Sequence, residues 1–278
     1  MSAANLVRDW LPPALRGVIG RASGRSLRFS GRPADWAQAQ ATSRGYADQA
    51  ILARVLHATR EVVAGCAAFE RDSVLFQRWQ PPFQLLAPLL RHALRHGGRL
   101  EVVDFGGSLG STYRLCKPFL PAGLVLRWRV VEQANFVAAG QAEFGDDELS
   151  FHLALADLPP PTAPRLLLVS SVLQYLEDPS AHLDAWCRFD AQTLLLDRTP
   201  LSSAAGHSLC IQHVPRHIYE ASYPTWILSR TRLLAQLASH WDLVCEFDCP
   251  EGRHRVVGGS AFEFSGLILE RVLERHTP

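Results

Sequence analysis

A run rich in glycine and serine follows one short apolar segment near the middle of the chain. Residues 100–105 read LEVVDF, and GGSLGST follows immediately. Glycine at the end of a strand lets the backbone approach a ligand closely, because no Cβ intrudes. The N-terminus of a following helix offers free N–H groups to an anion. The spacing therefore predicts a ligand-binding loop over residues 104–111.

Three ligand classes use loops of this kind, and the residue types distinguish them. A nucleoside triphosphate loop needs a lysine after its last glycine, and this run has none. A dinucleotide loop needs glycine where Ser108 and Ser111 stand. The pattern acid-x-Gly-x-Gly-x-Gly, typical of loops that bind S-adenosylmethionine, is met by Asp104, Gly106 and Gly110, with Ser108 in place of the middle glycine. We therefore expect S-adenosylmethionine as the cofactor, with a purely structural turn as the alternative. The predicted loop contacts are Asp104, Gly106, Gly107, Ser108, Gly110 and Ser111.

Polar residues at the ends of the next apolar runs extend the predicted cofactor site. Glu132 ends the second run, where a carboxylate can accept hydrogen bonds from both ribose hydroxyls, and Gln133 follows it. Asp157 follows the third run and is a candidate acceptor for the adenine amino group, although acids also cap turns. Ser170 and Ser171 end the fourth run. We expect these two serines to wall the reacting end of the cofactor.

Candidate bases lie at and beyond the end of the fifth apolar run. Asp197 ends that run, and His213 and Tyr223 follow in a polar and aromatic stretch. Histidine titrates near neutral pH, so His213 is the first candidate for proton removal, and Tyr223 is the second. His213 and His217 have the spacing of a metal-binding pair on a helix. Pro215 lies between them and no third ligand has a fixed spacing, so we expect no metal.

The same stretch supplies side chains suited to holding an acceptor. Aromatic rings stack on sugar or aromatic faces, and amide and guanidinium groups bind hydroxyls. We expect acceptor contacts from Arg198, Gln212, Tyr219 and Trp226. A packed linker between strands is the structural alternative. We also expect Pro215 and Pro224 to stiffen this segment as a loop.

Short apolar runs alternate with helical segments after residue 98. Such alternation is typical of a parallel sheet with crossover helices, and the last two runs lie close enough to form a hairpin. We predict an α/β fold with a doubly wound, seven-stranded, mostly parallel sheet. The predicted strands are 100–105, 124–131, 149–153, 166–170, 193–196, 241–247 and 262–269. The predicted helices among them are 112–120, 133–144 and 179–190.

A helical block precedes the predicted sheet. Apolar residues recur at helical spacing over 46–65 and 83–96, and we expect His92 and His96 to be solvated on the second helix. We predict that residues 1–98 form a basic arm and a helical lid, and that residues 99–278 form the cofactor-binding domain. The polar segment 69–73 would then help to line the acceptor cleft.

The composition is that of an ordinary globular protein. Hydrophobic residues make up 47% of the 278 residues and the formal net charge is +1, so no global field favours nucleic acid. No signal peptide or membrane span is visible, and we expect a soluble cytoplasmic protein. Residues 1–32 are rich in arginine. They indicate either a loosely ordered arm or a segment making weak peripheral contact with an anionic membrane.

The motifs in this order resemble a family of bacterial class I methyltransferases whose members often sit among surface-polysaccharide genes. The resemblance covers roughly residues 35–270. It rests on DFGGSLGST at 104–112, VEQ at 131–133, SSVLQYLEDP at 170–179, DRTP at 197–200, IYEASYPTW at 218–226 and FERDSVLF at 69–76. It implies the Rossmann-like methyltransferase fold, S-adenosylmethionine as cofactor and an enzyme that transfers a methyl group. It implies no particular acceptor.

The leading functional hypothesis is methylation of a hydroxyl on a sugar or another small acceptor. The end of the fourth run lacks the D-P-P-Y type of motif used on nucleobase or amide nitrogens. One alternative is an NAD-dependent oxidoreductase, which Ser108 and Ser111 disfavour. Another is a non-catalytic glycan-binding protein that keeps the methyltransferase fold.

Overall fold

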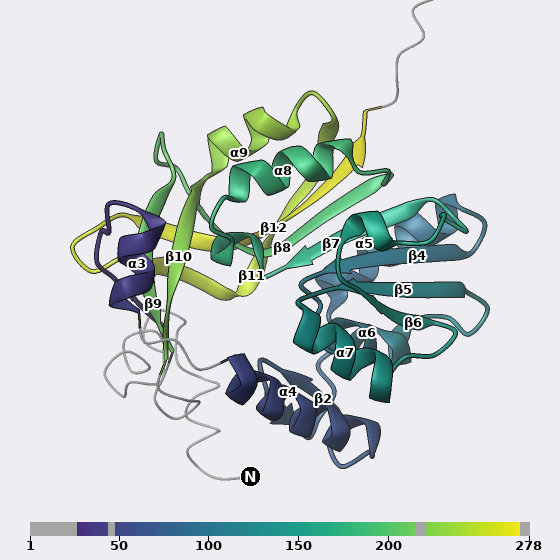
Figure 1. Cartoon of the computed structure of the whole chain (residues 1–278). Coiled ribbons are helices and arrows are strands. Elements are labelled where there is room, and N and C mark those ends of the chain that lie inside the picture. Colours follow the sequence, from purple (N-terminus) through teal and green to yellow (C-terminus); the bar gives the residue numbers. More distant parts are fainter. Residues whose placement is uncertain (1–26, 44–47, 215–220, 273–278) are drawn as a thin grey trace, which may run out of the picture.

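The protein is built around seven strands in the order β6-β5-β4-β7-β8-β12-β11 (Figure 1). The computed structural model describes residues 27–43, 48–214 and 221–272. All seven strands run parallel except β12, which pairs antiparallel with β8 on one side and β11 on the other. The strands are β4 (Arg99–Phe105), β5 (Val125–Val131), β6 (Leu149–His152), β7 (Arg165–Ser170), β8 (Thr193–Ser202), β11 (Trp241–Arg255) and β12 (Ala261–Arg271). Each of the seven predicted runs is a strand, and the final hairpin is confirmed.

Helices cover both faces of this sheet. Leucines of α5 (Phe83–Arg95), with Cys116 of α6 (Ser111–Cys116) and Val137 of α7 (Ala134–Glu143), pack into one core cluster. Trp186 of α8 (Pro179–Arg188) and Leu233 of α9 (Arg230–Leu237) belong to the cluster on the other face. Three short turns of 3₁₀ helix are η1 (Lys117–Phe119), η2 (Leu155–Asp157) and η3 (Leu173–Tyr175). The fold is therefore the predicted doubly wound, mostly parallel α/β sheet of Rossmann-like type.

The strand order reverses at β4. The chain winds from β4 through β5 to β6 on one side, then returns to build β7 and β8 on the other. In sheets of this kind the carboxyl ends of the two central strands diverge and leave a crevice for a ligand. Gly106 follows β4 and Ser171 follows β7, so both residues lie at this crevice.

Beyond Arg198 the sheet continues into strands that the sequence did not predict. β9 (Ser208–His213) pairs antiparallel with β10 (Ser222–Ser229), and β1 (Arg28–Ser30) pairs antiparallel with β9. Helix α3 (Trp36–Thr42) packs beside β9 and β10 (Figure 1). The prediction of a loop here is wrong for Pro224, which pairs with Ile211 inside β10. β10 meets β8 only at Leu228 and Ser229, so Pro224 lies where the other edge of β10 has no strand partner among the described residues.

Two elements from the N-terminal block lie at the carboxyl ends of the strands. Helix α4 (Asp48–Val63) packs through Val55 against Leu109 and Phe136. The hairpin of β2 (Phe69–Arg71) and β3 (Val74–Phe76) follows it in the chain. In Figure 1 both lie below the strand ends that α6 and α7 flank. No helix in the described part of the chain has the length and hydrophobicity that crossing a membrane requires.

The expectation that His92 is solvated is wrong. His92 is 2% exposed, because α5 packs flat on the sheet with this ring turned inward. Its Nδ1 shares a hydrogen bond of 2.9 Å with Thr193 Oγ1, and its Nε2 shares one of 2.9 Å with the Pro164 carbonyl. Burial lowers the pKa of His92 to about 4. The ring is thus a neutral link between α5 and the sheet.

Candidate active site

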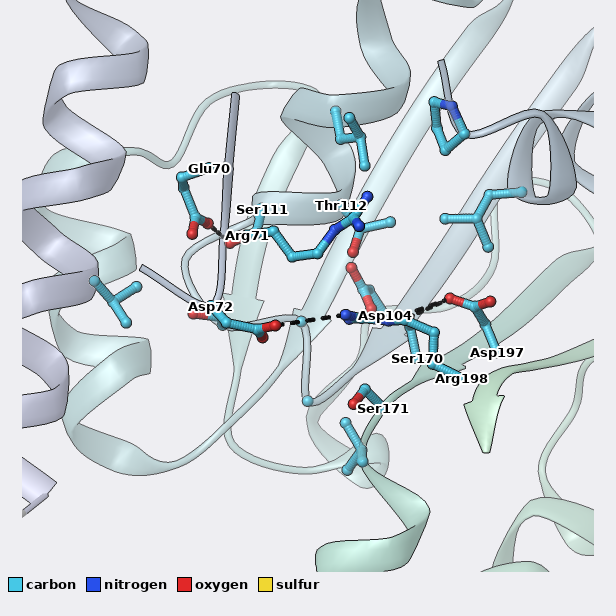
Figure 2. A pocket seen from close by; sticks show the side chains of 18 of the residues that line it. Glu70, Arg71, Asp72, Asp104, Ser111, Thr112, Ser170, Ser171, Asp197 and Arg198 are labelled. Carbon is cyan, nitrogen blue, oxygen red and sulfur yellow. Dashed lines mark hydrogen bonds and ion pairs between the residues drawn. The ribbon is translucent and has the colours of Figure 1, made fainter. Parts of the chain in front are cut away.

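An inner pocket of about 240 Å³ opens at the carboxyl ends of β4, β5 and β7, beside the middle of β8. Its lining includes the glycine-rich loop, the polar residues that end the other strands, and residues of the β2–β3 hairpin. Figure 2 shows Glu70, Arg71 and Asp72 facing Asp104 and Arg198 across this pocket. Most of the predicted cofactor residues therefore gather around one cavity. These are Asp104, Gly106, Gly107, Ser108, Ser111, Glu132, Ser170 and Ser171.

The glycines of the loop are required by close approach as well as by conformation. Gly106 has a φ of +74°, and a Cβ there would lie 2.4 Å from Cγ2 of Val172. A Cβ on Gly107 would lie 2.5 Å from the carboxyl carbon of Asp104. Gly110 caps α6 with a left-handed φ of +83°. The backbone can take this path only because these positions carry no side chain.

Backbone strain is concentrated at the same site. Among the described residues, five that are not glycine have a positive φ between 51° and 65°: Asp72, Ser73, Ser108, Ser171 and Arg198. All five line the inner pocket. Each such conformation costs about 1–3 kcal/mol and persists only where the surroundings impose it, which is typical of functional sites. Ser108 occupies this conformation at the position where the cofactor pattern has its middle glycine.

Asp104 is the most deeply buried acid of the pocket. Its side chain is 1% exposed, and Oδ2 accepts a hydrogen bond of 3.0 Å from the indole N–H of Trp128. Burial raises the pKa of Asp104 to about 7, and the nearby charge of Glu132 acts in the same direction. A cation placed against this carboxyl group would favour its ionised form.

Glu132 projects into the pocket from the end of β5. Its Oε2 accepts a hydrogen bond of 2.6 Å from the backbone N–H of Gln133, and burial raises the pKa of Glu132. Its carboxylate is thus fixed at the wall where the ribose was expected. Gln133 and Asp157 are exposed and do not line the inner pocket, and Gly110 shapes the loop without lining it.

The end of β7 and the middle of β8 carry a pair of polar side chains that contact each other. Ser170 and Asp197 face each other in register, and the Ser170 hydroxyl donates a hydrogen bond of 2.6 Å to Asp197 Oδ2. The Arg198 guanidinium donates through Nε to Ser170 Oγ at 3.3 Å. Its Nη1 lies 3.7 Å from Asp72 Oδ2 and 3.7 Å from Glu251 Oε1. Arg198 thus connects three segments of the chain at one point.

The β2–β3 hairpin is tied to the glycine-rich loop. Glu70 is 5% exposed, and its carboxylate accepts hydrogen bonds from the Ser111 hydroxyl and, at 3.1 Å, from the Ser73 backbone N–H. Burial raises the pKa of Glu70. Glu70, Arg71, Asp72 and Ser73 all line the inner pocket beside the glycine-rich loop, whereas the sequence predicted that segment 69–73 helps to line the acceptor cleft.

A second, outer cavity of about 590 Å³ adjoins the first. Its wall combines the strands added beyond Arg198 with residues of α3 and α4. Four residues line both cavities: Ile51, Asp72, Ser171 and Arg198. The two cavities therefore meet at the end of β7 and the middle of β8.

Gln212, a predicted acceptor contact, and Tyr223, a predicted candidate base, line this outer cavity from neighbouring strands. Gln212 of β9 pairs in register with Tyr223 of β10. The phenol of Tyr175 donates a hydrogen bond of 3.0 Å to Gln212 Oε1, and its ring packs edge-on against Tyr223. The sequence reasoning missed Tyr175, although it lies within the motif that follows β7, and it missed Glu251, which no local pattern marks.

His213 and Trp226 lie away from both cavities. Side chains alternate along β9, so Gln212 faces the outer cavity and His213 faces the other way, where Nε2 shares a hydrogen bond of 2.7 Å with Ser30 Oγ. This orientation argues against His213 as the base. Trp226 stacks on Trp36 and donates from its indole N–H to the Glu177 carbonyl at 3.3 Å. It lines neither cavity, although the sequence predicted it as an acceptor contact. Tyr219, Pro215 and His217 lie outside the described residues. Within the described ranges, no three His, Cys, Asp or Glu side chains gather as a metal site.

No family model matches the chain, and no curated protein matches it. Among solved structures, it is similar to the N-terminal domain of EvdMO1 in the presence of SAH and D-fucose, with 14% identity, 81% of this chain and 97% of that chain covered, and a TM-score of 0.45. It is also similar to CalS10, an amino pentose methyltransferase from Micromonospora echinaspora, with 10% identity, 69% and 92% covered, and a TM-score of 0.44. A third is the Burkholderia thailandensis 1,6-didemethyltoxoflavin-N1-methyltransferase, with 16% identity, 83% and 96% covered, and a TM-score of 0.43. Likenesses at this level carry no functional conclusion. The function proposed below is argued from the topology and the site of this chain.

Proposed function

We propose that this protein is an S-adenosylmethionine-dependent methyltransferase that methylates a hydroxyl group of a sugar or another small hydroxylated acceptor. The observation that carries the proposal is the junction of the two cavities at Ser171 and Arg198. One cavity has the glycine-rich loop and the carboxylate that a nucleoside cofactor needs. The other has the tyrosine and amide groups that bind hydroxyls.

The inner pocket suits a ligand that carries positive charge. Its lining holds three more acids than arginines: Glu70, Asp72, Asp104, Glu132 and Asp197 against Arg71 and Arg198. S-adenosylmethionine carries a sulfonium and an ammonium group, and a negative pocket raises the local concentration of such a ligand. Glu132 would hold the ribose hydroxyls, and the backbone around Gly106 and Gly107 would lie against the amino acid part.

When bound, S-adenosylmethionine supplies an electrophilic methyl group. The residues of this chain have three tasks around it. Ser171 and Arg198 wall the junction and orient the two reactants, and alignment of this kind supplies about 7–11 kcal/mol of the barrier. The buried hairpin residue Glu70 covers the inner pocket and helps to exclude water. Gln212 and Tyr223 bind and orient the hydroxyls of the acceptor.

Calorimetry followed by product analysis tests this function. We expect S-adenosylhomocysteine to bind with one site per chain and NADH to give no heat. Incubation with S-adenosylmethionine and a set of free, nucleotide-linked and methyl-glycosidic hexoses should then yield a product heavier by one methyl group. Since the resemblance points to surface polysaccharides, bacterial nucleotide sugars belong in that set. Absence of S-adenosylhomocysteine binding, or binding of NADH in its place, would overturn the proposal.

A further inference from the structure

Glu251 lies at the boundary between the two cavities. It belongs to the stretch of β11 between Asp248 and Arg253 where the register with β12 shifts, so the strand leaves its regular path there. Its neighbour Pro250 lines the inner pocket, while Glu251 itself lines the outer cavity. The irregularity of β11 therefore delivers one carboxylate to the point where cofactor and acceptor would meet.

The two carboxylate oxygens of Glu251 are in different situations. Oε1 lies 3.7 Å from Nη1 of Arg198. Oε2 is buried and has no hydrogen-bond partner among the described residues. A buried polar atom left without a partner is destabilising, and more so if it is charged. Glu251 lines the outer cavity, so a ligand group that reaches its carboxylate there would complete this hydrogen bonding.

The charges around Glu251 come from two other elements. Arg198 and Asp197 face it from β8, and Arg71 acts on it from the β2–β3 hairpin. Asp72 also lines the outer cavity, on the other side of Arg198. Burial is the largest influence and raises the pKa of Glu251, while Arg198 acts in the opposite direction. The result is a carboxylate held more basic than an exposed glutamate.

We propose that Glu251 is the general base that takes the proton of the acceptor hydroxyl on its carboxylate. This inference rests on the proposed methyltransferase function. In the reaction, the acceptor oxygen bonds to the methyl carbon, the carbon–sulfur bond breaks with its electron pair going to sulfur, and the hydroxyl proton moves to Glu251. Solvent at the open side of the outer cavity then takes that proton. Atoms and charge balance with S-adenosylhomocysteine and a methyl ether as products.

The other acids and phenols of the site are less suited to this step. Asp197 is 2% exposed, and its oxygens already have Ser170 at 2.6 Å and Cys249 Sγ at 3.7 Å as partners. Burial raises the pKa of Tyr175 to about 12, and its hydroxyl is engaged with Gln212. A base with so high a pKa is protonated at working pH. Glu251 has a carboxylate oxygen without a partner, and its carboxylate is less basic than the phenolate of Tyr175.

The test compares Glu251→Gln with wild type and with Glu263→Gln. Glu263 lies on the same hairpin, pairs with Arg253 at 3.0 Å and lines neither cavity, so it serves as the matched control. The probes are S-adenosylhomocysteine for binding, and S-adenosylmethionine with the hexose set described above for turnover. We expect Glu251→Gln to keep its S-adenosylhomocysteine affinity within about threefold, because the change lies outside the inner pocket. Its kcat should fall about 10²–10⁴-fold with little change in KM.

Two further readouts separate a base from a structural residue. Formate added to Glu251→Ala should restore part of the lost turnover, because it can occupy the vacated space and accept the proton. A raised folded pKa means that stability is lost as pH rises through that pKa. Wild type should therefore lose melting temperature relative to Glu251→Gln as pH rises above the ordinary titration range of a glutamate, and Glu263→Gln should not reproduce this difference.

The outcomes are distinct. A kcat for Glu251→Gln within about threefold of wild type overturns the proposal, and so does a melting-temperature difference that does not change with pH. The melting-temperature comparison tests the proposal even if no hexose of the set is methylated. Failure of wild type to bind S-adenosylhomocysteine would instead overturn the methyltransferase function itself.

Discussion

The indole N–H of Trp128 donates a hydrogen bond of 3.0 Å to Asp104 Oδ2, at a carboxyl group that is 1% exposed. Gly107 closes the other side so tightly that a Cβ would touch the carboxyl carbon. One neutral donor does not replace the lost water, so burial raises the pKa of Asp104 to about 7. Near neutrality this carboxyl group is thus partly protonated before any ligand binds.

We expect cofactor affinity to depend on pH through Asp104. The ammonium group of S-adenosylhomocysteine would favour the carboxylate, so binding releases a proton wherever Asp104 is protonated in the free protein. Affinity should therefore rise with pH up to the folded pKa, with Kd about tenfold lower at pH 8 than at pH 6. Calorimetry at several pH values, in buffers of different ionisation enthalpy, measures both the Kd and the released proton.

Asp104→Asn is the control for this pH dependence. The asparagine keeps an acceptor for Trp128 but cannot ionise. Its Kd should be weaker than that of wild type at pH 8 and nearly constant with pH. Because the folded pKa of Asp104 is raised, wild type loses stability as pH rises through about 7, and the variant should not. A wild-type Kd independent of pH would show that Asp104 does not respond to the ligand.

Glu132 is expected to contribute a large part of cofactor affinity. Hydrogen bonds to a charged group are worth ~1.5–3 kcal/mol each. Replacing Glu132 by alanine should therefore cost about 2–4 kcal/mol, roughly 30- to 700-fold in Kd for S-adenosylhomocysteine. Glu143→Ala is the matched control, because Glu143 lies on α7 with its carboxylate paired to Arg60 at the surface. Unchanged affinity in a folded Glu132→Ala protein would remove this residue from the site.

Gly106 is expected to be needed for space as well as for its φ. Gly97 offers the comparison, because it also has a positive φ of +63° but a Cβ there meets nothing within 4 Å. Gly97→Ala should therefore cost only the backbone strain of about 1–2 kcal/mol in unfolding free energy, with cofactor binding intact. Gly106→Ala should add the 2.4 Å contact with Val172 and lose S-adenosylhomocysteine binding, and Gly106→Val should abolish it. Denaturant unfolding and calorimetry separate the two effects. Normal binding by Gly106→Val would place the cofactor elsewhere.

The central sheet could be predicted from sequence because its signals are local. Each parallel strand is a short apolar run, and the burial of Leu166, Leu167 and Leu168 at 0% exposure shows why polar residues are excluded from such runs. The strands added beyond Arg198 lack this signal. Gln212, Ser222 and Thr225 are buried in β9 and β10, and Pro224 interrupts the pattern. Because polar residues occupy strand positions in β9 and β10, the sequence pattern there is typical of a linker.

The same distinction applies to the site. Glu132 could be found because it ends a strand at a fixed distance from the glycine-rich loop. Glu251 could not, because its place depends on an irregular pairing in β11 and on Arg198, which lies more than fifty positions earlier in the chain. His213 was selected for its chemistry, but a side chain in a strand faces one side only, and the register with β1 decides which. Chemical type is local information, whereas orientation comes from pairing.

His213 is expected to stabilise the added strands without taking part in turnover. Its Nε2 shares a hydrogen bond of 2.7 Å with Ser30 Oγ, which joins β9 to β1. His213→Asn and Ser30→Ala should each lower the free energy of unfolding by about 0.5–1.5 kcal/mol. The double variant should lose less than the sum, because both changes remove the same bond. Denaturant unfolding of the four proteins measures this coupling.

Unlike His213, Tyr223 is expected to affect methyl transfer. Tyr223 lines the outer cavity, and Tyr223→Phe removes the phenol oxygen alone. One lost hydrogen bond to the acceptor should lower kcat/KM by about tenfold, mainly through KM, with S-adenosylhomocysteine binding unchanged. His213→Asn should leave both kinetic constants within about twofold, because its ring faces away from the cavity. A fall in kcat of about 10²-fold or more in His213→Asn, in a protein that stays folded, would restore His213 as the base. The same fall in Tyr223→Phe would transfer that role from Glu251 to the phenol, since a binding contact alone does not lower kcat so far.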